Sequence, residues 1–190
     1  VCIKRSNYRT LCIFLSFLFC AIIRNMKETV HLRKVTPDDK NHFARWWRDA
    51  ELIALTSGAT KQVTDKAVEG YFQKLLHSIN DYHFLIVLEQ KVIGHVSLSK
   101  REDGWYETQI IIGDKECWGK GYGSEAIARL MEKTKALRIS KIYLEVRPTN
   151  IRAIRAYEKC GFVQKETIKN PHSTDLPEVL RMELEIKSVL

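Results

Sequence analysis

Hydrophobic residues cluster or alternate with polar ones in seven short stretches of a kind typical of β-strands. These stretches are Val30 to Val35, Phe84 to Leu88, Val92 to Leu98, Trp105 to Ile112, Ile142 to Val146, Phe162 to Ile168 and Val179 to Ile186. Apolar residues recur at helical spacing in four other segments, which are Pro37 to about Asp49, the segment after Thr64, the segment after residue 123, and Asn150 to Cys160. The pattern predicts a mixed α/β sheet in a single domain.

Capping and turn residues support several of these boundaries. Thr36 and Thr64 stand where helix N-caps are expected, and Asp103-Gly104 is a strong hairpin signal before the strand that begins at Trp105. The helix after Thr64 has an apolar stripe of Val68, Tyr71, Phe72, Leu75, Leu76 and Ile79.

The glycine-spaced segment Trp118 to Ala126 carries the first functional signal. It follows the apolar run Ile110 to Ile112 and opens a helical pattern. A strand that leads through glycines into a helix leaves backbone N–H groups for a phosphate or pyrophosphate. The spacing Gly119-x-Gly121-x-Gly123 is not the dinucleotide fingerprint, and no Walker A loop occurs in the chain. A tight strand-to-helix connection that binds no ligand is the alternative interpretation.

A second motif follows the strand that ends at Val146. Pro148 favours an extended backbone before it, Asn150 is suited to cap a helix, and Gly161 is suited to end that helix. Asn150, Ala153 and Tyr157 are spaced so that they share one helix face. The small Ala153 leaves room between an amide and a phenol, so this face could line a groove.

These two motifs resemble those of the GNAT superfamily of acyl-CoA N-acyltransferases, in particular its bacterial branch of ribosomal-protein, polyamine and antibiotic acetyltransferases. The superfamily motif Gln/Arg-x-x-Gly-x-Gly/Ala reads Trp118-Gly119-Lys120-Gly121-Tyr122-Gly123 here, with Trp in the first position. Residues 150–162 match Asn-x-x-Ala-x-x-x-Tyr-x-x-x-Gly-Phe at every signature position. The resemblance covers roughly residues 30–186. It implies an α+β fold with a mostly antiparallel sheet of about seven strands and about four helices.

The resemblance further implies that the strands Trp105 to Ile112 and Ile142 to Val146 splay apart and admit the pantetheine arm of acetyl-CoA. The arm would bond the backbone of Ile110, Ile111 and Ile112, and Asn150 and Ala153 would lie beside it. The diphosphate would lie on the amides of Trp118, Gly119, Lys120, Gly121, Tyr122, Gly123 and Ser124. No metal is implied.

Two residues are the candidates for catalysis. By resemblance Tyr157 would protonate the leaving thiolate, and a core aromatic is the alternative role. Glu107 shares a strand face with Gln109 and Ile111, and it is our candidate base for the amine. A carboxylate that faces solvent or orients the substrate is the alternative for Glu107.

The expected function is therefore N-acetylation of a primary amine by direct transfer from acetyl-CoA. The acceptor could be a protein N-terminus, a polyamine, an aminoglycoside-like drug or another small amine. A catalytically silent acyl-CoA-binding sensor of the same fold is one alternative, and an unrelated nucleotide-binding domain is another. The resemblance also allows a homodimer.

Charge and composition limit the kinds of molecule that this protein is expected to bind. The net charge is +8, but residues 1–25 contribute four of these charges and contain no acidic residue. The mild positive charge of the remaining chain argues against nucleic-acid binding and suits an anionic donor. The five cysteines form no CxxC pair, and the six histidines show no metal-ligand spacing.

The chain divides into an N-terminal extension at residues 1–25 and an N-acetyltransferase domain at residues 26–190. The apolar run Leu11 to Ile23 spans 13 residues, and a bilayer helix needs about 20. We favour translation of upstream sequence before Met26, with a signal-like segment or membrane anchor as the alternatives. Because the acyl-CoA donor is intracellular, we expect a cytoplasmic protein that does not bind membranes, unless residues 1–25 are an anchor.

Overall fold

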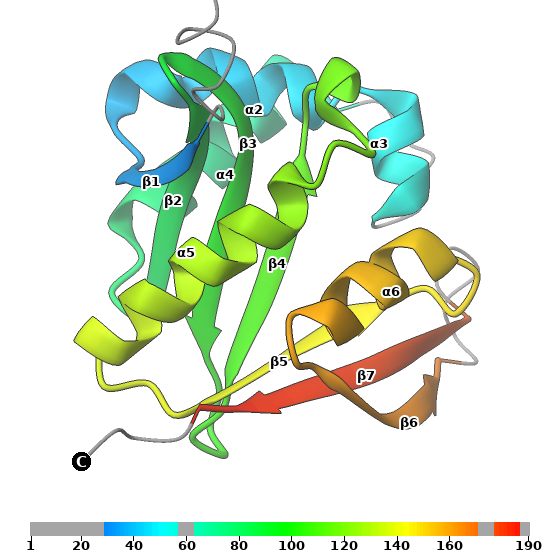
Figure 1. Ribbon diagram of the computed structural model, residues 1–190. Helices are drawn as coiled ribbons and strands as arrows, with labels where there is room; N and C mark the ends of the chain where they lie inside the picture. Colours follow the sequence, from blue (N-terminus) through cyan, green and yellow to red (C-terminus); the bar gives the residue numbers. More distant parts are fainter. Residues whose placement is uncertain (1–28, 57–62, 171–176, 187–190) are drawn as a thin grey trace, which may run out of the picture.

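The computed structural model describes residues 29–56, 63–170 and 177–186, which form a seven-stranded mixed sheet (Figure 1). The predicted N-terminal extension lies outside the described residues. The strand order is β1-β2-β3-β4-β5-β7-β6. The strands are β1 (Val30–Lys34), β2 (Asp81–Leu88), β3 (Lys91–Lys100), β4 (Tyr106–Ile112), β5 (Lys141–Val146), β6 (Val163–Lys169) and β7 (Glu178–Glu185). All neighbouring strands are antiparallel except β4 and β5.

Helices cover both faces of the sheet. On one face, α5 (Tyr122–Ala136) and α6 (Ile151–Lys159) pack on the larger core through residues such as Leu130 and Ile154. On the other, α2 (Lys40–Trp46), α3 (Ala50–Leu55) and α4 (Asp65–His77) supply Phe43, Leu52 and Phe72 to a second core cluster. Figure 1 shows α5 and α6 in front of the sheet and α2 and α4 behind it. Among the described residues, no helix is long and apolar enough to cross a membrane.

Strands β4 and β5 touch at one end only. They pair through Tyr106 with Ile142 and through Glu107 with Tyr143, and no later residues of the two strands pair. Beyond that point β4 stays paired with β3, and β5 stays paired with β7 along its whole length. The two strands therefore diverge from a shared base, as Figure 1 shows, and the predicted splay is present.

The predicted fold class is confirmed, and most element boundaries agree to within three residues. The helix expected from Pro37 to about Asp49 is instead a 3-10 turn, η1 (Pro37–Asp39), followed by α2 and then by a separate helix α3. Asp49 begins this third helix, because its carboxylate accepts hydrogen bonds from the backbone N–H groups of Glu51 and Leu52, both at 3.1 Å.

The predicted apolar stripe after Thr64 is partly wrong. Thr64 caps α4 as expected, with its hydroxyl accepting a 3.3 Å hydrogen bond from the backbone of Ala67. Ile79 lies beyond the end of the helix and is 94% exposed, and Tyr71 is 54% exposed. The chain leaves the helical path at Ser78, whose hydroxyl donates to Asp81 at 2.6 Å.

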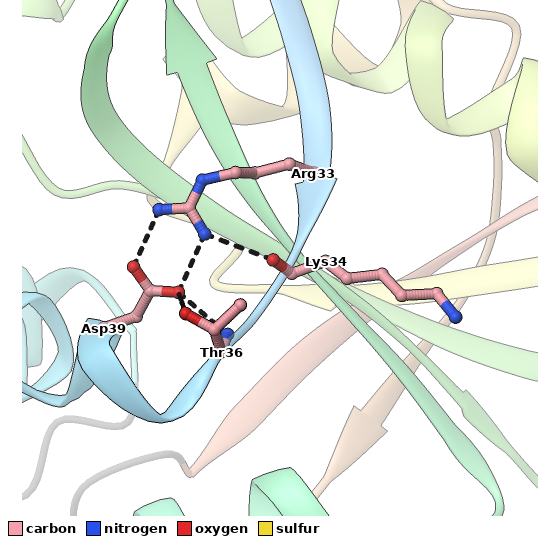
Figure 2. A network of polar contacts seen from close by, with 4 residues as sticks. All are labelled: Arg33, Lys34, Thr36 and Asp39. Carbon is pink, nitrogen blue, oxygen red and sulfur yellow. Dashed lines mark hydrogen bonds and ion pairs between the residues drawn. The ribbon is translucent and has the colours of Figure 1, made fainter.

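A buried carboxylate fixes the link between β1 and α2 (Figure 2). Asp39 is 3% exposed and accepts hydrogen bonds from both terminal nitrogens of Arg33, at 2.8 and 2.7 Å. It also accepts from the backbone N–H and the hydroxyl of Thr36, at 2.8 and 2.9 Å. Burial alone would raise the pKa of Asp39, but these donors outweigh it and lower the pKa to about 2.

We predict that Asp39→Asn lowers the free energy of unfolding by about 2 kcal/mol at neutral pH, because it removes the charge that holds Arg33 and Thr36. Since the folded-state pKa lies below the ordinary value, this contribution is complete above about pH 4 and disappears as the pH falls toward 2. Urea unfolding across this range measures the difference. Asp38→Asn, at an exposed carboxylate in the same turn, is the matched control. Equal losses in the two variants would contradict the assignment.

Candidate active site

The gap between β4 and β5 opens into a cleft of about 1440 Å³. Its walls come mainly from four parts of the fold: the two diverging strands, the turn and first residues of α5, α6 along its whole length, and the α2–α4 region. The cleft therefore joins segments that lie far apart in the sequence.

The glycine turn forms one end of the cleft. Gly119 and Gly121 have φ angles of 75° and 89°, which disfavour residues with a side chain. The helix begins at Tyr122, and its first backbone bond runs from Glu125 to the carbonyl of Gly121. The amides of Gly123 and Ser124 precede that bond, so they are oriented toward an anion at the helix start. The turn therefore presents backbone N–H groups at a helix N-terminus, and phosphate binding there stays a prediction.

Trp118 anchors the turn to its surroundings. Its indole N–H donates a 2.6 Å hydrogen bond to the carbonyl of Ile112, the last residue of β4. The guanidinium of Arg152, in the first turn of α6, lies 5.0 Å from the centre of the Trp118 ring. This cation–π contact joins α6 to the turn and holds a positive charge beside it.

The diverging strands present different side chains on their two faces. On the face of the larger core, the gap is lined by Thr108, Ile110, Leu144 and Val146. On the opposite face it is lined by Glu107, Gln109, Ile111 and Glu145. One side of the gap is consequently apolar apart from a hydroxyl, and the other carries both of the acidic side chains among the described lining residues.

Helix α6 brings Asn150, Ala153 and Tyr157 to the cleft, as the sequence predicts. Asn150 is the N-cap, and its side-chain oxygen accepts a 3.2 Å hydrogen bond from the backbone of Ala153. Its amide NH₂ group is the part left to donate to a ligand. Burial, with a smaller effect of Cys160, raises the pKa of Tyr157 to about 12. Tyr157 is thus a neutral phenol, able to donate a proton, throughout the physiological range.

Glu107 is held in place by two neighbours. Its carboxylate forms an ion pair with Arg101 from the β3–β4 hairpin and accepts a 3.3 Å hydrogen bond from Gln109. The Arg101 guanidinium also lies close enough to the hydroxyl of Tyr143, the β5 residue that pairs with Glu107, to influence its pKa. Arg101 therefore interacts with side chains of both strands at the base of the gap.

Glu145 stands across the gap from Glu107, and its role was not predicted from the sequence. The pKa of Glu145 is raised, first because the surrounding protein displaces water from its carboxylate and second because of the negative charge of Glu107. Among the described residues, the carboxylate of Glu145 has no hydrogen-bond or ion-pair partner, in contrast to that of Glu107. An acidic residue in the otherwise apolar run Ile142 to Val146 was the signal available in the sequence.

The remaining walls carry basic and aromatic side chains. Arg147, Arg152, Arg155 and Lys159 are the basic residues among the described lining, and Arg152 of these lies against Trp118 of the turn. Trp47 and Tyr71 also line the cleft, with their rings 5.9 Å apart in an edge-to-face contact. The cleft thus offers positive charge that suits phosphates, and carboxylates and aromatic faces that suit a cation.

The structure brings nearly all the predicted site residues together. Glu107, Tyr157 and every predicted cofactor-binding residue line the cleft except Lys120, whose exposed side chain lies outside it. Of the aromatic residues outside the two motifs, Trp46 and Trp47 at the end of α2 line the cleft, whereas Trp105 and Tyr106 at the start of β4 do not. In the described part of the chain, no group of three or more His, Cys, Asp or Glu residues could hold a metal ion.

Comparison with known proteins identifies the family. The family model of the acetyltransferase (GNAT) domain matches residues 29–163. This chain belongs to the GNAT acetyltransferase family.

Named relatives fall within the same family. The chain is 26% identical over 166 residues to aminoglycoside N(6')-acetyltransferase type 1 of Klebsiella pneumoniae, covering 80% of this chain and 82% of that protein. It is 34% identical over 102 residues to spermidine N(1)-acetyltransferase of Vibrio cholerae, covering 52% and 58%. The structure of spermidine N-acetyltransferase from Vibrio cholerae with CoA and spermine superposes with a TM-score of 0.72 at 25% identity, covering 83% and 95%.

Proposed function

We propose that this protein transfers the acetyl group of acetyl-CoA to a primary amine of a small molecule that carries several positive charges. The observation that carries the proposal is the β4–β5 gap, which has an anion-binding turn at one end and two carboxylates at the other. An anionic donor and a cationic acceptor can enter such a cleft from opposite ends and meet at its base.

The turn and the gap fit the donor. The diphosphate would rest on the backbone amides of residues 119–124, with Arg152, which packs on the Trp118 ring, near enough to add positive charge. The edge of β4 beyond Glu107 has no strand partner on the side of the gap. The pantetheine arm would bond this edge as an added strand, along Ile110, Ile111 and Ile112.

Different side chains around the gap would carry out the separate proton transfers. Tyr157 would give its hydroxyl proton to the sulfur as the carbon–sulfur bond breaks, and it would regain a proton from the acylated nitrogen, directly or through water. Asn150 would donate to the arm. An amine of ordinary pKa, about 10.4, must first lose a proton, which costs about 4–5 kcal/mol at pH 7. Glu107 would accept that proton, directly or through water, before the amine nitrogen attacks the thioester carbon.

The acceptor end favours a multiply charged amine. Glu107 and Glu145 face each other across the gap, so one ammonium can meet Glu107 while a second meets Glu145. Trp47 and Tyr71 add faces on which further cationic groups can pack. The names of the relatives support the same class, because aminoglycosides and spermidine each carry several amines.

Thiol release from acetyl-CoA with a panel of amines tests this function. We expect turnover with a polyamine or an aminoglycoside, and much lower kcat/KM with a monoamine or with a peptide that has a free N-terminus. Turnover restricted to the peptide would replace the proposed acceptor with a protein. Binding of coenzyme A without release for any amine would favour the silent acyl-CoA-binding module.

A thermal-shift comparison separates the donor from other nucleotides. Coenzyme A is expected to raise the unfolding midpoint, and ATP and NAD at the same concentration are not. A shift with ATP or NAD alone would contradict the proposed donor site.

We predict that Gly121→Ala weakens the binding of coenzyme A about tenfold. Its φ of 89° costs a residue with a side chain about 1–2 kcal/mol, and relief of that strain moves the turn amides away from the diphosphate. Gly104→Ala is the matched control, because Gly104 has a φ of 81° in the β3–β4 hairpin, and a side chain at either glycine meets no atom within 4 Å. Calorimetric titration measures both. Equal affinities in the two variants would contradict the phosphate role of the turn.

We also predict that the two cleft carboxylates have separable effects. Glu107→Gln should lower kcat/KM about 100-fold or more with every amine, because the proton acceptor is lost. Glu145→Gln should raise KM mainly for acceptors with two or more charges. Glu102→Gln, at an exposed position beside Arg101, is the control. Near-normal kcat/KM in Glu107→Gln would remove that residue from the mechanism.

A further inference from the structure

The closed end of the β4–β5 gap is built from two buried side chains. Glu107 and Tyr143 form the last residue pair between the strands, so Thr108 and Leu144 are the next residues in the same register. Thr108 pairs with Leu98 of β3, and Leu144 pairs with Met182 of β7, which places both on the face of the larger core. They are 5% and 2% exposed, and both line the cleft.

The direction of β4 decides which part of a donor reaches this closed end. The anion-binding turn follows the C-terminal end of the strand, after Ile112, whereas Thr108 lies near its beginning. At about 3.3 Å per residue, Thr108 and Ile112 are about 13 Å apart. A thioester carrier whose diphosphate rests on the turn and whose arm follows β4 therefore directs its acyl group toward Thr108 and Leu144.

Thr108 brings a polar atom to this apolar corner. Among the described residues, no partner hydrogen-bonds its buried hydroxyl. A buried hydroxyl without a partner costs about 1–3 kcal/mol, and valine would fill the same space in a strand without that cost. The hydroxyl is therefore hard to explain by packing alone, but a carbonyl that enters the gap would satisfy it.

We propose that Thr108 and Leu144 form the floor of an acyl pocket that limits the donor to a short chain, and that the Thr108 hydroxyl donates a hydrogen bond to the thioester carbonyl. This assignment rests on the proposed function and adds a specificity determinant to it. The methyl of Thr108 and the side chain of Leu144 exclude longer acyl groups. The carboxylates of Glu107 and Glu145 lie on the opposite face of the same strands, so the acceptor approaches from the other side.

Two substitutions at one position separate the steric role from the polar one. Thr108→Ser removes one methyl and keeps the hydroxyl, whereas Thr108→Val keeps the shape and removes the hydroxyl. Binding is measured by calorimetry with coenzyme A, acetyl-CoA, propionyl-CoA and butyryl-CoA, without acceptor, so that no turnover occurs. Coenzyme A has no carbonyl and is the internal control for the rest of the donor site.

We expect the wild-type protein to bind acetyl-CoA more tightly than butyryl-CoA. Thr108→Ser should reduce that preference about tenfold, as expected for one methyl in an apolar pocket. Thr108→Val should keep the preference for acetyl over butyryl, but weaken acetyl-CoA about fivefold relative to coenzyme A. Initial rates with acetyl-CoA and propionyl-CoA should change in the same direction.

The outcomes distinguish this assignment from the proposed function. A wild-type protein that does not bind coenzyme A would overturn both. Normal binding with an unchanged chain-length preference in Thr108→Ser would overturn the pocket floor alone. An unchanged ratio of acetyl-CoA to coenzyme A affinity in Thr108→Val would overturn the hydrogen bond. If Thr108→Ser does not fold, Leu144→Val removes one methylene from the facing wall and tests the same floor.

Discussion

The active-site geometry depends on the fact that β4 and β5 share only two residue pairs before they diverge. Each strand is held by its other neighbour, β4 by β3 and β5 by β7, so the gap cannot close without breaking one of those ladders. Backbone groups along the open edges still need partners, because buried N–H and C=O groups rarely stay unpaired. An extended ligand that supplies amide groups is the natural complement to such an opening.

The cleft is lined by side chains of both charge signs. Arg152 of α6 lies against Trp118 of the turn, and the two carboxylates among the described lining residues lie toward the base of the strands. The start of α5 adds positive potential to the turn through its backbone dipole. The ion pair of Arg101 with Glu107, and its contact with Tyr143, keep the acidic end rigid. In the proposed complex, this arrangement would keep a cationic acceptor apart from the diphosphate while its amine approaches the thioester.

Much of this site could be predicted from the sequence because its motifs are local. The turn requires glycines at positive φ, and α6 requires a cap at Asn150 and a glycine at its end. Such backbone features demand particular residue types, so they can be recognised in the sequence. Alternation along β4 also placed Glu107 and Ile111 correctly on one face of that strand.

What could not be predicted depends on contacts between distant segments. The acidic residue in β5 was visible in the sequence, but its position beside Glu107 depends on the pairing of β4 with β5, which joins segments far apart in the chain. Arg101 and Tyr143 meet at the base of the gap from a hairpin and a strand about 40 positions apart. The separate helix α3 was also missed, since its cap, Asp49, looked like the end of the preceding helix.

The crystal structure of the complex with acetyl-CoA tests the account most directly. It should show the diphosphate on the amides of residues 119–124, the arm between β4 and β5, and the sulfur within hydrogen-bonding distance of the Tyr157 hydroxyl. A donor bound outside the gap, or a gap closed by direct β4–β5 hydrogen bonds, would contradict it.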